Sequence, residues 1–255
     1  MTILRSDATI PPEVAQQLRQ AQRVVVLTGA GISAESGVPT FRDAQTGLWA
    51  QYDPHQLATP QAFMRNPKLV WDWYAWRRDL VTKVVPNPGH YALVAIEQRV
   101  PNFNLVTQNI DGLHRKAGSH EIVELHGNIF RVRCFTENVL VEDWNDLIGK
   151  GLPHCPNCGG FLRPDVVWFG ETLPVEALAH AVKASQSADF FLVVGTSGIV
   201  QPAASLPFEA IDTGAMLVEV NPEPTPISPY VSYTLRGAAG IILPALVVAA
   251  WPDQA

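Results

Sequence analysis

Three polar residues directly follow an apolar, strand-like segment in the middle of the sequence. Residues 103–107 lead into Gln108 and Asn109, and Asp111 follows two positions later. Two amides and a carboxylate would be costly to bury at the end of a strand without hydrogen-bond partners. This pattern favours a site that binds or orients a polar ligand. The alternative is an Asx-type turn that starts the next helix.

A glycine-rich turn is a candidate nucleotide site. Residues 29–34 (GAGISA) follow the strand-like segment 23–28 and match the pattern G-x-G-x-x-G/A. Glycines in that context allow close approach of a pyrophosphate, and a following helix supplies amide donors. The alternative is that they are ordinary turn residues. An ordinary dehydrogenase would add a second strand and an acidic residue ~20 positions on. Because residues 41–58 lack a strand pattern and Asp53 lies in a loop-like segment, a dehydrogenase is disfavoured.

The three cysteines indicate metal or redox chemistry. They are Cys134, Cys155 and Cys158, and the last two form a Cys-x-x-Cys pair. An odd number with one such pair excludes a disulfide scaffold and is typical of a reducing compartment.

The elements that must position these residues alternate between strands and helices. Apolar, β-branched runs at 23–28, 103–108, 189–196 and 215–221 predict buried parallel strands. Residues 88–99 and 174–187 predict helices with proline near the first turn. The fold class is therefore α/β with an open parallel sheet. Two stretches, 41–85 with an aromatic helix at 66–84 and 129–165 with the cysteines, break the alternation. They predict a smaller module that caps the carboxyl edge of the sheet, where ligands bind.

Composition narrows the class of protein further. The 255 residues carry a formal charge of −6, which argues against a nucleic-acid binder. The first residues lack the apolar core of a signal peptide. The most apolar stretch, 238–251, contains Pro244 and is shorter than the ~20 residues of a membrane span. We expect a cytoplasmic chain without membrane or nucleic-acid partners.

Six segments in a fixed order resemble the sirtuins, the NAD-dependent protein-lysine deacylases. They are GAGISAESGVPTFRD (29–43), TQNIDGLH (107–114), ELHGN (124–128), CPNCGGFLRPDVVWFGE (155–171), GTS (195–197) and VEVN (218–221). The resemblance covers about residues 14–247 and implies a Rossmann-like sheet with helices on both faces. The NAD-binding domain it implies comprises 1–42, 88–128 and 163–255. The smaller inserted module comprises a helical part, 43–87, and a zinc-ribbon-like part, 129–162.

The resemblance implies that polar and glycine residues at the strand ends bind NAD. Asp111 would read the nicotinamide carboxamide, and Phe41 would shield the reactive ribose from water. For Phe41 the alternative is a packed loop anchor. The implied NAD contacts are Gly29, Ala30, Gly31, Phe41, Arg42, Gln108, Asn109, Asp111, Gly195, Thr196, Ser197, Asn221 and Ala239.

The resemblance also implies that His126 and Asn109 are catalytic. His126 would act as general base, since imidazole titrates near neutral pH, and Asn109 would orient the ribose and a water. The acyl oxygen of the substrate would attack the ribose and expel nicotinamide. His126 would then deprotonate a ribose hydroxyl, and water would release deacylated lysine and O-acyl-ADP-ribose. Without its motif, a histidine after a strand is usually a hydrogen-bonded surface group.

Two segments bear on the acyl-lysine substrate. Residues 166–171 resemble the strand to which an extended peptide adds, with Val167, Phe169 and Gly170 at the acyl-lysine tunnel. Tyr74 and Arg77 share one face of the helix 66–84 and resemble the pair of the subgroup that removes succinyl, malonyl and glutaryl groups. Pro54 stands where deacetylase-type relatives carry a bulkier residue. The alternatives are a plain buried strand and an amphipathic helix with a solvated arginine.

The cysteines depart from the four-cysteine zinc site that the family usually carries. Cys134, Cys155 and Cys158 are present, but Glu137 stands where the fourth cysteine belongs. Glu137 and His154 are candidate fourth ligands. The third possibility is that zinc is weakly bound or absent, with Trp144, Leu147 and Ile148 packing in its place.

Together these features predict an enzyme that uses NAD to remove acyl groups, preferably acidic ones, from lysine side chains of protein or peptide substrates. We expect a monomer with one structural zinc ion. The alternatives are a plain deacetylase, a mono-ADP-ribosyltransferase and, in another class, a catalytically inactive NAD-sensing module. The presence of Asn109, Asp111 and His126 argues against an inactive site.

Overall fold

The larger sheet consists of six parallel strands. The computed structural model describes residues 9–39, 53, 57–142, 144 and 151–254. The strand order is β3-β2-β1-β7-β8-β9. The strands are β1 (Arg23–Thr28), β2 (Asn102–Thr107), β3 (Ile122–Glu124), β7 (Phe190–Val194), β8 (Met216–Val220) and β9 (Tyr233–Leu235). The direction of winding reverses between β1 and β7, so a ligand is expected at the carboxyl ends of these two strands.

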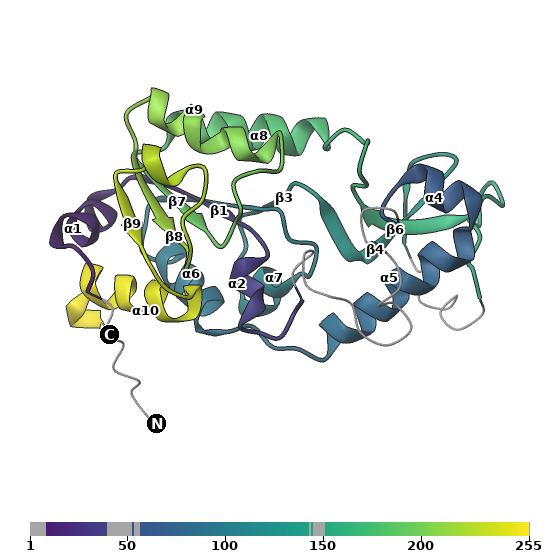
Figure 1. Ribbon diagram of the computed structural model, residues 1–255, viewed down its shortest axis with the longest axis horizontal. Coiled ribbons are helices and arrows are strands. Elements are labelled where there is room, and N and C mark those ends of the chain that lie inside the picture. The colour runs from purple at the N-terminus through teal and green to yellow at the C-terminus, as the bar shows by residue number, and fades with distance from the viewer. Residues whose placement is uncertain (1–8, 40–52, 54–56, 143, 145–150, 255) are drawn as a thin grey trace.

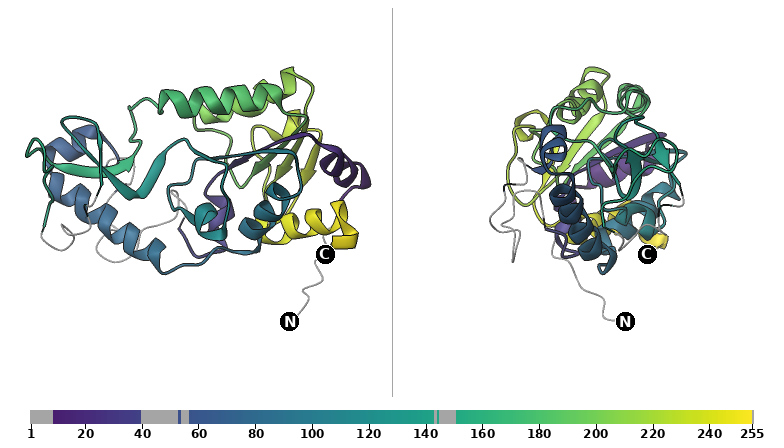
Figure 2. Two further views of the ribbon diagram at one scale, coloured as in Figure 1. Left: turned by 180° about the vertical axis from the view of Figure 1, so that it is seen from behind. Right: turned by 90° about the vertical axis from the view of Figure 1, so that its right-hand side faces the viewer.

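Helices cover both faces of this sheet (Figures 1 and 2). One face packs against α1 (Pro12–Gln20), α6 (Pro88–Glu97) and α10 (Ala239–Ala250). The other face packs against α8 (Val175–Ser187) and α9 (Leu206–Asp212). The shorter helical segments in the described residues are α2 (Gly31–Ala34), α7 (Leu113–Ala117), η3 (Ala203–Ser205), η4 (Ser228–Tyr230) and η5 (Pro252–Gln254).

Strand β1 shows why the central strands are apolar at consecutive positions. Val24 and Val26 belong to the core under α1, α6 and α10. Val25 and Leu27, which point to the opposite face, belong to the core under α8 and α9. Because both faces are covered, an alternating polar pattern would bury polar side chains.

A second, antiparallel sheet with two helices lies at the far end of the molecule (Figure 1). Its order is β5-β4-β6, and β4 pairs with both neighbours. The elements are α4 (Pro60–Arg65), α5 (Pro67–Thr82), β4 (Gly127–Cys134), β5 (Leu140–Val141) and β6 (Leu162–Val166). Aromatic residues, among them Phe63, Trp73 and Trp168, form the core between the helices and the sheet.

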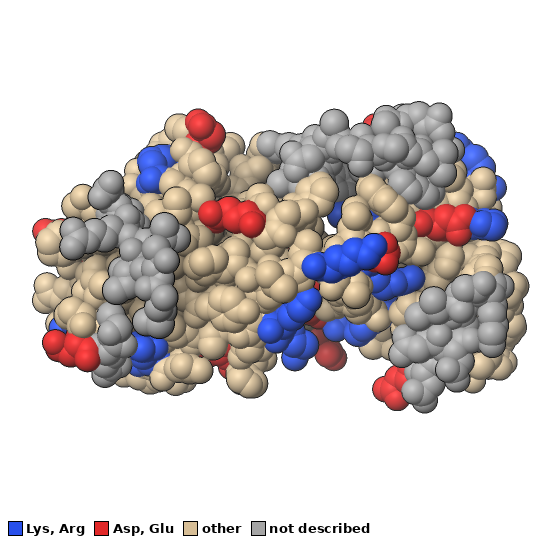
Figure 3. Space-filling view, turned by 90° about the horizontal axis from the view of Figure 1, so that it is seen from below, with Lys and Arg blue, Asp and Glu red and all other residues tan. Residues whose placement is uncertain are grey.

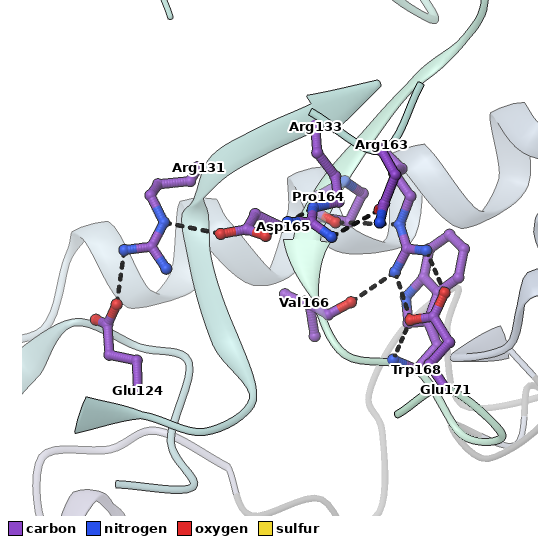
Figure 4. A network of polar contacts seen from close by, with 10 residues as sticks. Glu124, Arg131, Arg133, Arg163, Pro164, Asp165, Val166, Trp168 and Glu171 are labelled. Atoms are coloured by element: carbon purple, nitrogen blue, oxygen red, sulfur yellow. Dashed lines mark hydrogen bonds and ion pairs between the residues drawn. The ribbon is translucent and has the colours of Figure 1, made fainter. Parts of the chain in front are cut away.

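An ion-pair network joins the two sheets (Figure 4). Arg131 on β4 bonds Glu124 at the end of β3, 2.6 Å away, and Asp165 on β6, 2.8 Å away. Gly127, at the start of β4, has a φ of +79°, and a Cβ there would lie 2.1 Å from the Asp165 carbonyl oxygen. Glycine is therefore required where the chain passes from one sheet to the other.

The predicted strands and helices are largely confirmed. Strands β1, β2, β7 and β8 lie within two residues of their predicted ends, and α5, α6 and α8 also form where they were expected. The short strands β3 and β9 were missed. The helix expected after the glycine turn is only a single turn, α2. The division into two domains stays a prediction.

The distribution of charged side chains and the length of the most apolar helix can be compared with what the composition predicted. On the face in Figure 3, lysine and arginine side chains gather near the middle and have acidic neighbours. Within the described part of the chain, no helix has the length and apolar character needed to cross a bilayer. The most apolar one, α10, has 12 residues and contains Pro244.

Candidate functional site

Four neighbouring strands of the large sheet end in one row. Thr28 of β1 pairs in register with Thr107 of β2 and Val194 of β7, and Val194 pairs with Val220 of β8. The next residue after each strand is therefore brought to the same edge. These four residues are Gly29, Gln108, Gly195 and Asn221. All four were predicted to contact NAD.

The glycines of the first turn are required by contact between two strand ends. A Cβ on Gly29 would lie 2.7 Å from Thr196 Cα, and one on Gly31 would lie 2.7 Å from Gly195 Cα. Gly195 itself has a φ of +59°. The Gly31 N–H donates to the Gly195 carbonyl at 2.7 Å, and the N–H groups of Ile32 and Ser33 also bond to backbone carbonyls. The N–H groups of Gly31, Ile32 and Ser33, which were among the donors expected for a pyrophosphate, are thus paired within the chain.

Polar side chains connect the ends of β2, β7 and β8. The Gln108 amide donates to Thr196 Oγ1 at 2.9 Å. The Asn221 amide donates to the Thr196 carbonyl at 2.9 Å. Thr196 is buried, whereas Gln108 and Asn221 are half-buried. The two amides are therefore held in fixed orientations at the row of strand ends.

A second polar chain runs from Asn109 to Asp111. The amide nitrogen of Asn109 donates to the Gly29 carbonyl at 3.0 Å and to Ser33 Oγ at 3.2 Å. Ser33 in turn donates to Asp111 Oδ2 at 2.7 Å, and the Leu113 N–H donates to Oδ1 at 2.9 Å. Burial raises the pKa of Asp111, and these two donors oppose the rise. The Asx-type turn that the sequence left open is present, but it is part of a larger network.

His126 is fixed in one tautomer beside this network. Its Nδ1 lies 2.9 Å from the Gln108 carbonyl oxygen. A carbonyl can only accept, so Nδ1 carries the proton and Nε2 keeps its lone pair. Burial lowers the pKa of the imidazole, which favours the neutral form. Nε2 can therefore accept a proton from a hydroxyl group of a bound ligand.

The segment after β6 is folded around a buried ion pair. Arg163 pairs with the Glu171 carboxylate through its two terminal guanidinium nitrogens, Nη1 and Nη2. Nη2 also donates to the Val166 carbonyl at 2.6 Å (Figure 4). The guanidinium lies 3.3 Å from the centroid of the Trp168 ring. The backbone N–H of Trp168 donates to Glu171 Oε2 at 2.8 Å. Strand β6 ends at Val166, so the strand expected over 166–171 is wrong beyond that residue.

The residues expected at the acyl-lysine tunnel are held by backbone bonds in this segment. The Val167 N–H donates to the His126 carbonyl at 3.0 Å, which joins the segment to the candidate base. The Phe169 N–H donates to the Ala58 carbonyl at 2.9 Å, and the Phe169 side chain is 44% exposed. Gly170 has a φ of +86°. A plain buried strand is therefore excluded for Phe169.

Tyr74 and Arg77 lie between this segment and Asp111. The Tyr74 hydroxyl is buried and accepts a hydrogen bond from Trp168 Nε1 at 3.1 Å. Burial raises the pKa of Tyr74 to about 12, and the charge of Arg77 opposes that rise. Burial lowers the pKa of Arg77, and the charges of Tyr74 and Asp111 oppose that fall. A fully solvated Arg77 is therefore excluded. Arg78 points elsewhere, over the rings of Trp71 and Trp144.

The three cysteines and Glu137 form one cluster. The thiol sulfurs and a carboxylate oxygen of Cys134, Glu137, Cys155 and Cys158 all lie within 4.8 Å of one another. Ligand atoms at ~2.3 Å from a tetrahedral zinc ion are about 3.8 Å apart, which is within this 4.8 Å limit. His154 is outside the cluster, and its Nδ1 bonds the Gly159 carbonyl oxygen at 2.8 Å. The geometry therefore favours Glu137 over His154 as the fourth ligand and fits zinc.

The remaining predicted residues are buried or half-buried, or lie outside the described part of the chain. Ala239 is buried at the start of α10, where its backbone packs against Gly89. Ala30 precedes α2, and Ser197 is half-buried after Thr196. Phe41, Arg42, Pro54, Leu147 and Ile148 lie outside the described residues. Trp144 does pack edge-on against Trp71, with ring centroids 6.0 Å apart.

Sequence reasoning missed residues that act as partners of the predicted ones. Ser33 bridges Asn109 and Asp111, and Arg163 with Glu171 holds the segment at Trp168. Ser33 lies inside the glycine motif, so the sequence already indicated that its hydroxyl is close to a strand end and to the predicted site residues. Arg163 on β6 and Glu171 are eight residues apart, and the sequence alone does not show that their side chains meet.

Comparison with known proteins identifies the family. The model of the Sir2 family matches residues 29–202. This chain belongs to the Sir2 family. It is 56% identical over 205 residues to an NAD-dependent protein deacylase of Aquifex aeolicus, which covers 80% of this chain and 85% of that protein. An NAD-dependent protein deacylase of Pyrococcus abyssi is 51% identical over 240 residues, covering 92% of this chain and 96% of that protein.

Solved structures of Sir2 proteins share the whole fold. A crystal structure of a Sir2 homologue–NAD complex superimposes with a TM-score of 0.91 at 42% identity, covering 97% of this chain and 96% of that one. A structure of Sir2 bound to acetylated peptide superimposes with a TM-score of 0.83 at 30% identity, covering 93% and 97%. The row of strand ends described above thus lies at the carboxyl edge of the parallel sheet of a Sir2 fold. Its amides, hydroxyls and carboxylate suit the amide and ribose groups of NAD.

Proposed function

We propose that this Sir2-family chain is an NAD-dependent protein-lysine deacylase. The observation that carries the proposal is the fixed tautomer of His126, whose Nε2 lone pair is available beside the Asn109–Ser33–Asp111 network. The relatives named NAD-dependent protein deacylase support it, as do neighbouring structures with an acetylated peptide and with a myristoylated histone peptide. An NAD-sensing module would not require a base held in this form.

Each residue of the site would have a separate role in binding NAD or in moving a proton. Bound NAD supplies an electrophilic ribose carbon with nicotinamide as the leaving group. Asp111 would hold the carboxamide, and Asn109, whose amide hydrogens are both used, would present Oδ1 as an acceptor. Gln108, Thr196 and Asn221 would hold ribose hydroxyls or phosphate. His126 would take a ribose hydroxyl proton at Nε2, and its Nδ1–H bond to Gln108 would stabilise the resulting cation.

We propose acidic acyl groups such as succinyl, malonyl and glutaryl as preferred substrates, with acetyl as an additional one. Arg77 is a half-buried guanidinium beside Tyr74, and Tyr74 contacts Trp168 of the segment that carries Val167 and Phe169. A guanidinium suits the terminal carboxylate of an acyl chain, and burial strengthens that attraction. The rival is a plain deacetylase.

We also propose that Cys134, Glu137, Cys155 and Cys158 bind one zinc ion. Three thiolates and a carboxylate form a closed donor set, which is typical of a structural rather than a catalytic zinc site. The ion would connect β4 with the chain before β6. That the protein acts in the cytoplasm as a monomer, without nucleic-acid or membrane partners, stays a prediction.

Nicotinamide release with and without an acyl-lysine peptide tests the proposed function. A deacylase releases nicotinamide in proportion to acyl-peptide consumed and little in its absence. Equal consumption of NAD with an unacylated peptide would favour ADP-ribosyl transfer. Binding of NAD without any release would favour the sensing module. Either of these two results would contradict the proposal.

A further inference from the structure

Two buried histidines lie together behind the row of strand ends. His90 comes from the first turn of α6 and His114 from α7, and their ring centroids are 4.9 Å apart. Both side chains are buried, with exposed fractions of 0% and 3%. Within the described part of the chain, His90 Nε2 and His114 Nδ1 are buried ring nitrogens without a hydrogen-bond partner. Neither residue belongs to the NAD or acyl-lysine contacts described above.

The tautomer of His90 follows from its contact with the helix N-terminus. The Asn87 backbone N–H donates to His90 Nδ1 at 3.3 Å. Nδ1 is therefore an acceptor, and the proton of the neutral ring is on Nε2. Burial lowers the pKa of His90 to about 4, so the ring is neutral at pH 7. His90 Nε2 is thus a buried N–H group, and it lacks a hydrogen-bond partner among the residues that the structure describes.

The tautomer of His114 follows from a pair of threonines. Thr28 donates to Thr107 Oγ1 at 2.8 Å, so Thr28 Oγ1 has only lone pairs left for His114 Nε2, which lies 2.9 Å away. Nε2 then carries the proton and Nδ1 is an acceptor. Among the same described residues, His114 Nδ1 is buried without a hydrogen-bond partner, as is His90 Nε2. Burial, followed by the charge of His90, lowers the pKa of His114.

This chain of bonds ends at Asn109. Thr107 Oγ1 also accepts the backbone N–H of Asn109 at 3.0 Å. The direction of each of these bonds is therefore set: His114 donates to Thr28, Thr28 donates to Thr107, and the Asn109 backbone N–H donates to the same oxygen. Thr28 and Thr107 are opposite each other in the register of β1 and β2. The chain fixes where the backbone leaves β2 and hence where the Asn109 side chain lies.

We propose that His114 is a positioning residue that holds Asn109 through the two threonine hydroxyls, with its tautomer set by Thr28. This rests on the proposed function, because Asn109 is assigned there to NAD. The imidazole touches neither substrate in this account. It acts through the Thr28–Thr107 pair, and its contribution depends on a donor at Nε2.

Kinetics of matched variants test the proposal. His114→Met keeps the volume and removes the donor, and it should lower kcat by about 10- to 100-fold, the scale of a small misplacement in an active site. His114→Gln restores a donor near Nε2 and should keep kcat within about threefold of the original chain. The KM for acyl-peptide should change less than about twofold in both. Equal losses in the two variants, or no loss in either, would overturn the proposal.

A second pair of variants tests whether His114 affects kcat through Thr28. Thr28→Val removes the hydroxyl with little change of shape. If His114 acts through Thr28, adding His114→Met to Thr28→Val should lower kcat by less than about twofold more. If the losses of kcat in the two single variants multiply in the double variant, His114 does not act through Thr28.

Ring-nitrogen NMR separates this proposal from the proposed function. In the ¹⁵N-labelled full chain at pH 7, both His90 and His114 should be neutral with the proton on Nε2. A proton on His114 Nδ1, or a charged ring, would overturn the inference whether or not the protein deacylates lysine. Absence of NAD-dependent deacylation by the original chain with the predicted tautomers would instead reject the proposed function alone.

Discussion

At the scale of single residues, hydrogen-bond direction decides which groups are available for chemistry. The Gln108 carbonyl oxygen fixes the His126 proton on Nδ1, and Ser33 has its only hydrogen committed to Asp111. Asn109 can therefore only donate to Ser33. These constraints leave His126 Nε2 and Asn109 Oδ1 as acceptors at the site. Both acceptors suit the removal of a proton from an oriented ribose hydroxyl, which is the role proposed for them.

The lowered pKa of His126 predicts the pH dependence of the reaction. The base is the neutral ring, and activity is lost as the pH falls and the ring is protonated. Because burial places the pKa below its usual value near 6.5, the acidic limb of kcat/KM should lie below pH 6.5. A pH profile with acyl-peptide measures it. The control is His180→Ala, which changes an exposed histidine bonded to Asn104 and should leave the limb in place. A limb at or above pH 6.5 in the original chain would contradict this.

Arg77 should determine the preference for acidic acyl groups. Arg77→Met keeps much of the apolar stem and removes the charge, so kcat/KM for a succinyl-lysine peptide should fall roughly 10- to 100-fold more than for the acetyl peptide. That is the scale of one charge-assisted hydrogen bond. Lys68→Met removes an exposed charge from the same helix, where Lys68 pairs with Asp72, and serves as the control. Equal losses on both peptides would assign Arg77 a purely structural role.

The sequence predicted the positions of site residues better than their partners. The polar residues after the strand at 103–107 suggested Gln108, Asn109 and Asp111, and the family resemblance added Asn221. The structure brings Gln108 and Asn221 to one edge, because strands in a parallel sheet deliver their last residues there. The bond directions depend on Ser33, Thr28 and Thr107, whose contacts join segments far apart in the chain. Such contacts have no local signal in the sequence.

At the scale of elements, the short connecting segments position the site residues as much as the helices and strands do. The glycines at 29, 31 and 195 are required because the ends of β1 and β7 touch. The segment after β6 is irregular, yet the Arg163–Glu171 pair and the bond from Trp168 to Tyr74 fix it. The prediction of a strand over 166–171 failed beyond Val166 because apolar residues there pack on an ion pair and on α5 instead of continuing the pairing. Apolar runs of this length do not distinguish the two cases.

The cysteine cluster predicts how zinc is held between β4 and β6. Protein purified without added metal should contain about one zinc per chain by elemental analysis. A chelator should remove it faster from Glu137→Ala and more slowly from Glu137→Cys, since a fourth thiolate completes the usual structural site. Glu142→Ala, an exposed acid in the same segment, is the control and should not change the rate.

Absence of zinc would contradict the metal site. It would favour packing of Trp144 against Trp71 and Arg78 as the support of this region.

At the scale of the whole molecule, the two sheets place the row of strand ends next to the segment expected to hold acyl-lysine. β3 leads into β4 through His126, and Val167 after β6 returns to bond the His126 carbonyl. The Glu124–Arg131–Asp165 network fixes the same junction (Figure 4). The candidate base therefore lies at the point where both parts of the chain meet, which is where an acyl group and a ribose would react.

Product analysis of His126→Ala tests the central claim most directly. Mass spectrometry follows the original chain and the variant on matched acetyl-, malonyl- and succinyl-lysine peptides with NAD. The account predicts deacylated peptide, nicotinamide and O-acyl-ADP-ribose from the original chain, and turnover at least ~100-fold slower from a folded variant that still binds NAD. Near-normal turnover by His126→Ala, or deacylation without NAD by the original chain, would contradict it.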